Sequence, residues 1–139
     1  MYTEKQNIMS CPQDKLEMIQ IKVAIVGSRE ITFYQFERYL PESTSEILSG
    51  GAKGIDTCAR EFAKEHQIPF TEFLPDYHRF GRAAPIKRND RLIDAADMVL
   101  IFWDGTSKGT QYVIRRCEKR NKSHQVIRSR PIGNDNSRL

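Results

Sequence analysis

The sequence predicts a single α/β domain of the Rossmann-like type. Strand-like apolar runs alternate with helix-like segments of about ten residues along the chain. Residues 23–26 are apolar without alternation, which is typical of a strand buried on both faces of a parallel sheet. A length of 139 residues suits one such domain. We therefore expect a three-layer sandwich around a mainly parallel sheet of about five strands.

The first half of the chain predicts three strands and two helices. Residues 21–29 (IKVAIVGSR), 45–49 (SEILS) and 69–75 (PFTEFLP) predict the strands. Residues 31–40 (ITFYQFERYL) predict a helix, because Phe33, Phe36, Tyr39 and Leu40 have helical spacing and Pro41 follows. Residues 54–67 predict an amphipathic helix.

The second half begins with a segment that we expect to be a loop. Residues 76–90 (DYHRFGRAAPIKRND) are polar and basic, and a loop of this length is often functional. Residues 91–96 and 109–121 predict helices, and residues 97–105 and 124–129 contain strands. We place the domain at residues 21–128. An extension precedes it at residues 1–20, with a helical stretch near residues 15–20, and a disordered basic tail follows at residues 129–139.

The positive charge is concentrated at the C-terminal end. The formal net charge is +4, and from Arg115 onward there are eight Lys or Arg against two acids. A basic end can attract nucleic acid. The alternative is a solvated helix face followed by the tail, and the sequence leaves both interpretations open.

The composition indicates a cytoplasmic protein that requires no metal or cofactor. No apolar run approaches the roughly 20 residues of a membrane span, and the first residues lack the layout of a signal peptide. Cys11, Cys58 and Cys117 are far apart and form no zinc-binding spacing with the histidines. We expect free thiols that fill space in the core rather than redox centres.

Three glycine-rich loops follow predicted strands, at residues 27–29 (GSR), 49–54 (SGGAKG) and 104–110 (DGTSKGT). Glycine lets backbone N–H groups approach a ligand closely, and helix N-termini favour anions. Glycine also ends strands for structural reasons, but three such loops at one sheet edge favour phosphate or nucleotide binding. None matches the P-loop or the dinucleotide-binding pattern. The predicted ligand-binding residues here are Gly27, Ser28, Arg29, Ser49, Gly50, Gly51, Gly54, Asp104, Gly105, Ser107, Lys108, Gly109 and Thr110, with Lys53 as a further source of charge.

Asp56, Arg88 and Asn89 are further predicted ligand-binding residues, and Asp56, Arg88 and Trp103 each carry an alternative. Asp56, near a predicted helix start, either interacts with the helix dipole or accepts hydrogen bonds from a ribose. Arg88 and Asn89 precede the helix that leads into the fourth strand, so Arg88 either faces the ligand or is solvated. Trp103 ends that strand and either belongs to the core or stacks on a base.

Three motifs occur in the chain in the order VAIVGSR, ILSGGAKGIDTCAREFA and KRNDRLIDAADMVLIFWDGTSKGT, over about residues 23–127. In this combination the chain resembles the YspA/YpsA-related branch of the SLOG superfamily. This superfamily has Rossmann-like folds and includes the cytokinin-activating LOG proteins and the DNA-processing protein DprA. The resemblance implies a nucleotide or nucleotide-derived ligand between the two glycine motifs, and LOG relatives make a homodimer plausible.

The resemblance to LOG phosphoribohydrolases also bears on catalysis. Arg88 matches an Arg that precedes the fourth strand in those enzymes, but their Glu after the glycine motif is missing, since Gln111 follows Thr110. Cleavage of an N-glycosidic bond needs a carboxylate. Asp56 or Asp104 could supply that carboxylate instead. The catalytic residues are therefore unknown, with Arg88 and Asp56 as the candidates.

These observations predict a module that binds or senses a nucleotide or nucleotide-sugar phosphate. The first alternative is an enzyme, either a nucleoside-monophosphate phosphoribohydrolase or another nucleotide hydrolase. The second is single-stranded nucleic-acid binding, as in DprA, which would need a basic groove with exposed aromatic residues. We expect no membrane partner.

Overall fold

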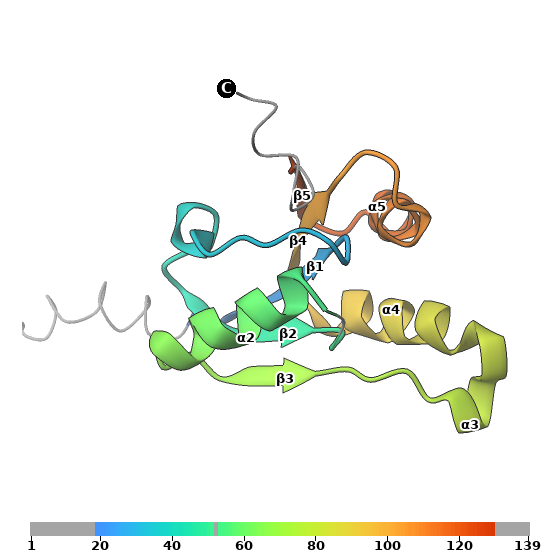
Figure 1. Ribbon diagram of the computed structural model, residues 1–139. Coiled ribbons are helices and arrows are strands. Elements are labelled where there is room, and N and C mark those ends of the chain that lie inside the picture. Colours follow the sequence, from blue (N-terminus) through green and yellow to red (C-terminus); the bar gives the residue numbers. More distant parts are fainter. Residues whose placement is uncertain (1–18, 52, 130–139) are drawn as a thin grey trace, which may run out of the picture.

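The computed structural model describes residues 19–51 and 53–129, which form a parallel sheet with helices on both faces (Figure 1). The strands are β1 (Ile21–Gly27), β2 (Thr44–Ser49), β3 (Phe70–Glu72), β4 (Met98–Trp103) and β5 (His124–Arg128). All four pairings are parallel, and the five strands have the order β3-β2-β1-β4-β5. The predicted α/β fold class is confirmed.

Two hydrophobic clusters cover the two faces of the sheet. One face packs against helix α2 (Ile55–Glu65) and the short 3-10 helix η1 (Phe36–Arg38). The other packs against helices α4 (Ala84–Ala95) and α5 (Lys108–Lys119). In β1, Ile25 belongs to the first cluster and Ala24 to the second, and both are fully buried. This double burial explains the unbroken apolar run that identified the strand.

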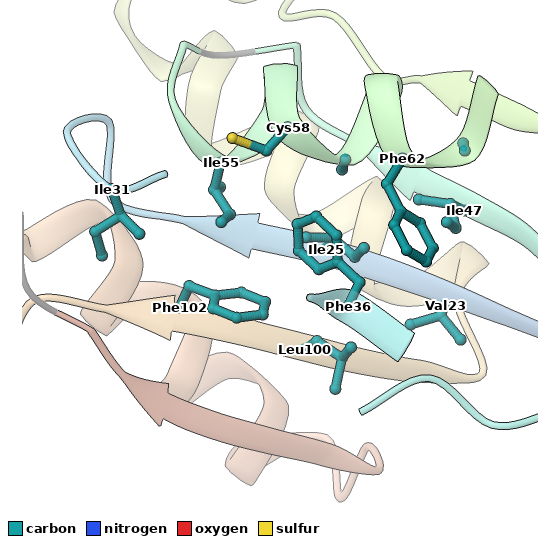
Figure 2. Close-up of a cluster of buried hydrophobic side chains, with 12 residues drawn as sticks. Val23, Ile25, Ile31, Phe36, Ile47, Ile55, Cys58, Phe62, Leu100 and Phe102 are labelled. Carbon is teal, nitrogen blue, oxygen red and sulfur yellow. The ribbon is translucent and has the colours of Figure 1, made fainter. Parts of the chain in front are cut away.

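The helix predicted at residues 31–40 is wrong, because the structure has only the single turn η1 there. The rings of Phe33, Phe36 and Tyr39 instead surround Phe102 of β4, with centroid distances of 4.9, 5.5 and 6.2 Å. Figure 2 shows Phe36 between α2 and the sheet. Aromatic and β-branched residues are weak helix formers, and here the regular spacing serves core packing.

The loop predicted at residues 76–90 is also wrong. Helix α3 (Tyr77–Phe80), the 3-10 turn η2 (Gly81–Ala83) and the first half of α4 occupy it. Asp76 caps α3 by accepting a hydrogen bond from the backbone N–H of Arg79 at 3.1 Å. Pro85 lies in the first turn of α4, where its missing N–H costs no hydrogen bond. The helix predicted at residues 91–96 is therefore the second half of a longer helix.

The remaining predicted elements are confirmed, although β3 has three residues where seven were predicted. The predicted apolar face of α2, which consists of Ile55, Cys58, Ala59, Phe62 and Ala63, is buried. The predictions for residues 1–18 and 130–139 lie outside the described residues. None of the helices in the described part of the chain has the length and apolar character that crossing a membrane requires.

Cys58 and Cys117 are buried free thiols, while Cys11 lies outside the described residues. Burial raises the pKa of Cys117 to about 11. The thiolate is the reactive form of cysteine. We therefore expect Cys117 to be inert toward thiol reagents at neutral pH in the folded protein.

The strand order sets the place where a ligand can bind. From β1 the chain proceeds outward to β2 and β3, and then crosses to β4 and β5 on the other side of β1. The connections that leave β1 and β4 therefore diverge at the carboxyl ends of these strands. Ligands of open α/β sheets bind in the crevice at such a switch point.

Candidate functional site

A cavity of about 280 Å³ lies at this switch point, and we call it the strand-end cavity. Residues at the ends of β1 and β2, the first turn of α2, one side of α4 and the N-terminus of α5 line it. The lining residues are Val26, Gly27, Arg29, Gly50, Asp56, Pro85, Arg88, Asn89, Leu92, Ser107, Gly109 and Thr110. The structure thus brings many of the predicted ligand-binding residues together around one space.

A second hollow of about 450 Å³ adjoins the cavity, and we call it the Tyr77 hollow. Its lining residues are Arg29, Gly50, Gly51, Lys53, Pro75, Tyr77, Pro85 and Arg88. It shares Arg29, Gly50, Pro85 and Arg88 with the strand-end cavity. The two spaces are therefore neighbours with a common wall.

Arg88 projects from α4 into this common wall. Its Nη1 donates hydrogen bonds to the carbonyl oxygens of Gly50 and, at 3.3 Å, Phe73, and its Nε donates to Oδ1 of Asn89 at 2.8 Å. These hydrogen-bond partners are uncharged, so they orient the guanidinium without neutralising it. Burial lowers the pKa of Arg88, while nearby Asp56 raises it. The protein therefore holds a half-buried positive charge against the cavity, and Asp56 offsets part of the cost of its burial.

Position 50 has no room for a side chain, because Arg88 lies over Gly50. A Cβ atom at Gly50 would lie 2.9 Å from Nη1 and 3.1 Å from Cζ of Arg88. Any larger residue there would displace the guanidinium. Gly50 therefore contributes to the site through its carbonyl group and its lack of a side chain.

One side of α4 supplies four lining residues, namely Pro85, Arg88, Asn89 and Leu92. Their spacing of three and four residues places them on a single helix face. The sequence did not point to Pro85, because the first half of α4 was predicted to be a loop. It did not point to Leu92 either, because the short helix predicted at residues 91–96 did not extend back to Arg88. Recognising Pro85 as a helix-start residue would have revealed this face.

Asp56 is the buried acid of the cavity, with 4% of its surface exposed. It lies in the first turn of α2, so the helix dipole stabilises its negative charge, and its side chain also lines the cavity. Both sequence interpretations of Asp56 are therefore compatible with its position. A buried carboxylate there is placed to accept hydrogen bonds from ligand hydroxyl groups.

The N-terminus of α5 presents hydroxyl groups to the cavity. Ser107 caps the helix, and its Oγ lies 3.2 Å from Oγ1 of Thr110. Thr110 in turn lies 3.4 Å from Oγ of Ser28, which is 2% exposed. Ser28 also accepts a hydrogen bond from the backbone N–H of Asp104 at 3.3 Å. This hydroxyl chain ties the end of β1 to the loop after β4.

Gly109 is the second residue of α5, and nothing lies within 4 Å of the position that its Cβ would occupy. Glycine inside a helix is about 0.5–1 kcal/mol less favourable than alanine. No described neighbour requires glycine here for packing. Its absent side chain instead leaves the N-terminus of α5 open to the cavity.

A family model for DNA recombination-mediator protein A matches residues 13–123. The chain belongs to this family. The match confirms the predicted membership of the SLOG superfamily, with DprA among the relatives. No curated protein and no solved structure matches the chain.

In this member of the DNA recombination-mediator protein A family, six of the residues predicted to bind a ligand line neither the strand-end cavity nor the Tyr77 hollow. They are Ser28, Ser49, Gly54, Asp104, Gly105 and Lys108. Gly54 has a packing role, because a Cβ there would lie 2.2 Å from the carbonyl oxygen of Arg29. Ser49 is fully buried, and its Oγ makes no hydrogen bond to the described residues. Nothing in the structure explains this hydroxyl.

Trp103 and Asp104 hold the loop between β4 and α5. Trp103 Nε1 donates to the carbonyl oxygen of Ser107 at 3.0 Å, and the guanidinium of Arg128 lies 5.7 Å from the Trp103 ring centroid. The half-buried Trp103 ring therefore supports the loop and is partly covered. Asp104 Oδ1 accepts hydrogen bonds from the backbone N–H groups of Thr106 and Ser107, both at 2.8 Å.

Replacing Asp104 by Ala should lower the free energy of unfolding by about 1–2 kcal/mol, because the backbone N–H groups of Thr106 and Ser107 lose their side-chain acceptor. Burial raises the pKa of the Asp104 carboxyl, but the hydrogen bonds from Thr106 and Ser107 outweigh this effect and lower it. The stabilisation by the carboxylate is therefore complete above the ordinary pKa of 3.8 and is lost only below it. Urea unfolding at pH 7 measures the change, and Asp104→Asn, which keeps Oδ1, is the control. Equal stability of Asp104→Ala and the wild type would contradict this role.

Part of the positive charge near the C-terminal end is neutralised within the fold. Arg116 of α5 pairs with Asp90 of α4 at 3.0 Å, and Arg120 pairs with Asp94. These cations join two helices on one face of the sheet. Among the described residues, the basic side chains that line the two hollows are Arg29, Lys53 and Arg88.

Proposed function

We propose that this protein binds a nucleotide or a nucleotide-derived phosphate ligand in the strand-end cavity. The observation that carries the proposal is the guanidinium of Arg88, which uncharged partners hold against the cavity. Burial makes this cation costly to the protein, Asp56 offsets only part of that cost, and an approaching anion would offset more of it. A ligand phosphate supplies that charge with a geometry that suits a guanidinium.

The rest of the cavity suits the other parts of a nucleotide. The first N–H groups of a helix have no partner within the helix, so the start of α5 can bind a phosphate oxygen. Ser107 and Thr110 add hydroxyl groups, and Arg29 adds charge. Asp56 is placed to accept hydrogen bonds from ribose hydroxyls. A volume of about 280 Å³ lies near the lower limit of ligand pockets, about 300 Å³, which favours one nucleotide unit in this cavity.

We favour binding without turnover. Glycoside hydrolysis ordinarily uses two carboxyl groups. Asp56 is the single acid among the described residues that line the strand-end cavity, and Gln111 follows Thr110 on α5. The alternative of an N-glycosidic-bond or nucleotide hydrolase would have to use Asp56 alone. Chromatography of the ligand after incubation tests it, since released base or phosphate would show turnover.

Replacing Arg88 by Gln should weaken AMP binding roughly tenfold or more, because a hydrogen bond to a charged group contributes about 1.5–3 kcal/mol. Isothermal titration calorimetry measures the change. The matched control is Arg91→Gln on the same helix, since Arg91 lies over Phe73 and lines neither hollow.

Arg88→Lys separates binding from folding, because it retains the charge but not the guanidinium fork. We expect an intermediate AMP affinity with a far-ultraviolet circular dichroism spectrum like that of the wild type. Folded Arg88→Gln protein that binds AMP as tightly as the wild type would overturn the proposal.

Single-stranded nucleic-acid binding is the second candidate function, and membership of the DNA recombination-mediator protein A family favours it. The basic residues Arg29, Lys53 and Arg88 provide a cationic surface at the strand ends. Binding through them should weaken steeply with salt. A salt-insensitive affinity for an oligonucleotide would argue against this candidate.

A further inference from the structure

The end of β5 is held against the end of β4, next to the loop that leads into α5 (Figure 1). Arg128 is the register partner of Trp103 in the parallel pairing of these two strands. The backbone N–H of Ser129 then donates a hydrogen bond to the carbonyl oxygen of Trp103 at 2.9 Å. The last residues of β5 therefore lie beside the start of the loop between β4 and α5.

The guanidinium of Arg128 covers two parts of this region. It lies 5.7 Å from the ring centroid of Trp103, within the range of a cation–π interaction. It also lies over Gly105, because a Cβ there would be 2.5 Å from Nη2 and 2.9 Å from Cζ of Arg128. The φ of Gly105 is +93°, a conformation that suits glycine. Gly105 therefore makes room for Arg128 at the start of the loop.

Trp103 connects Arg128 to the first turn of α5. The carbonyl oxygen of Ser107 accepts two hydrogen bonds, from Nε1 of Trp103 at 3.0 Å and from the backbone N–H of Gln111 at 3.1 Å. Ser107 is the N-cap of α5, so the bond from Gln111 is the first hydrogen bond of the helix. The position of the Trp103 ring therefore influences where α5 begins and how its first N–H groups face the strand-end cavity.

We propose that Arg128 is a positioning residue for the phosphate of the ligand. It holds the Trp103 ring and the loop at Gly105, and thereby keeps the N-terminus of α5 in the orientation that binds the phosphate. Arg128 lines neither the strand-end cavity nor the Tyr77 hollow, so it acts through Trp103 and not by contact with the ligand. This inference rests on the proposed function, because it concerns the same phosphate site.

Calorimetric titration of Arg128→Ala with AMP and with adenosine tests the inference. AMP should bind roughly tenfold more weakly than to the wild type, which corresponds to the loss of about one hydrogen bond to the phosphate. The affinity for adenosine should not change, because adenosine has no phosphate. Arg128→Lys keeps a cation over the ring but not the guanidinium fork, so its AMP affinity should lie between those of the wild type and Arg128→Ala.

Trp103 is the only tryptophan of the chain, so tryptophan fluorescence reports this contact directly. Quenching by acrylamide should be stronger in Arg128→Ala than in the wild type, because the ring loses its cover. Trp103→Phe, which removes Nε1, should also weaken AMP binding. The double variant should bind AMP no more weakly than the weaker single variant, because both changes disturb the same connection to Ser107.

The charge-matched control is Arg115→Ala, which removes an exposed cation of α5 that lines neither hollow. Its AMP affinity should equal that of the wild type, and a loss as large as that of Arg128→Ala would indicate an effect of net charge and overturn the inference. Unchanged AMP affinity in Arg128→Ala, an equal loss for adenosine, or additive losses in the double variant would also overturn it. In each of these cases a weaker binding of AMP by Arg88→Gln would still support the proposed function, whereas absence of AMP binding to the wild type would overturn both.

Discussion

Gly109→Val is expected to weaken AMP binding by a factor on the order of 100 while the protein keeps its fold. The Cβ position of Gly109 has no neighbour within 4 Å, so the new side chain enters open space at the start of α5. In the proposed complex a phosphate fills that space. Loss of two hydrogen bonds to a charged group, at about 1.5 kcal/mol each, corresponds to this factor.

Gly109→Ala is the matched control for helix stability. Alanine should raise the free energy of unfolding by at most about 1 kcal/mol, because it is the better helix former. Its single methyl group should reduce AMP affinity less than valine does. The glycine Gly51 is unsuitable for this test, since its φ is +78° and a Cβ there would lie 2.6 Å from Cδ2 of Leu74. A Gly109→Val protein with wild-type AMP affinity would place the ligand elsewhere.

Phe36→Ala should lower the free energy of unfolding by about 3–5 kcal/mol, the range for a buried phenylalanine. Phe36 is fully buried. Its ring lies 5.3 Å from the rings of both Phe33 and Phe62 and 5.5 Å from that of Phe102 (Figure 2). The truncation leaves a cavity between the sheet and α2. Equilibrium unfolding in urea, followed by circular dichroism, measures the loss.

Tyr77→Ala is the control for Phe36→Ala, because it removes an aromatic ring from a side chain that is 61% exposed. We expect a change below about 1 kcal/mol for this variant, as for most surface substitutions. A similarly small change for Phe36→Ala would mean that the segment around η1 contributes little to the core.

The central sheet could be predicted from the sequence because burial on both faces leaves a simple signature. The apolar runs that became β1 and β4 lack alternation, and glycine or aspartate follows each of them. Such runs fit few structures other than a parallel sheet between two helical layers. The carboxyl ends of the strands then gave the region of the site without further information.

Two segments could not be predicted because local pattern and tertiary role diverge there. Phe33, Phe36 and Tyr39 have nearly helical spacing, but their rings pack around Phe102, a residue far along the chain. The segment around Tyr77 contains Gly81 and many charges, which concealed a capped turn and the start of α4. The Tyr77 hollow was missed as a consequence.

The glycines of the site show a limit of sequence patterns. Gly54 and Gly109 belong to similar loops, yet Gly54 is required because the chain passes close to Arg29, whereas Gly109 has open space beside it. Close packing of the chain and open space for a ligand both favour glycine. Only the neighbours in space distinguish a packing glycine from one that leaves room for a ligand.

The most direct test is a calorimetric titration of the wild-type protein with AMP and with adenosine, which differ only in the phosphate. Binding through Arg88 and the N-terminus of α5 predicts that AMP binds and that adenosine binds at least about tenfold more weakly. AMP at about 100 times its Kd should also stabilise the fold by about 2.7 kcal/mol. Equal affinities for the two ligands, or no binding of AMP, would contradict a phosphate-binding strand-end cavity.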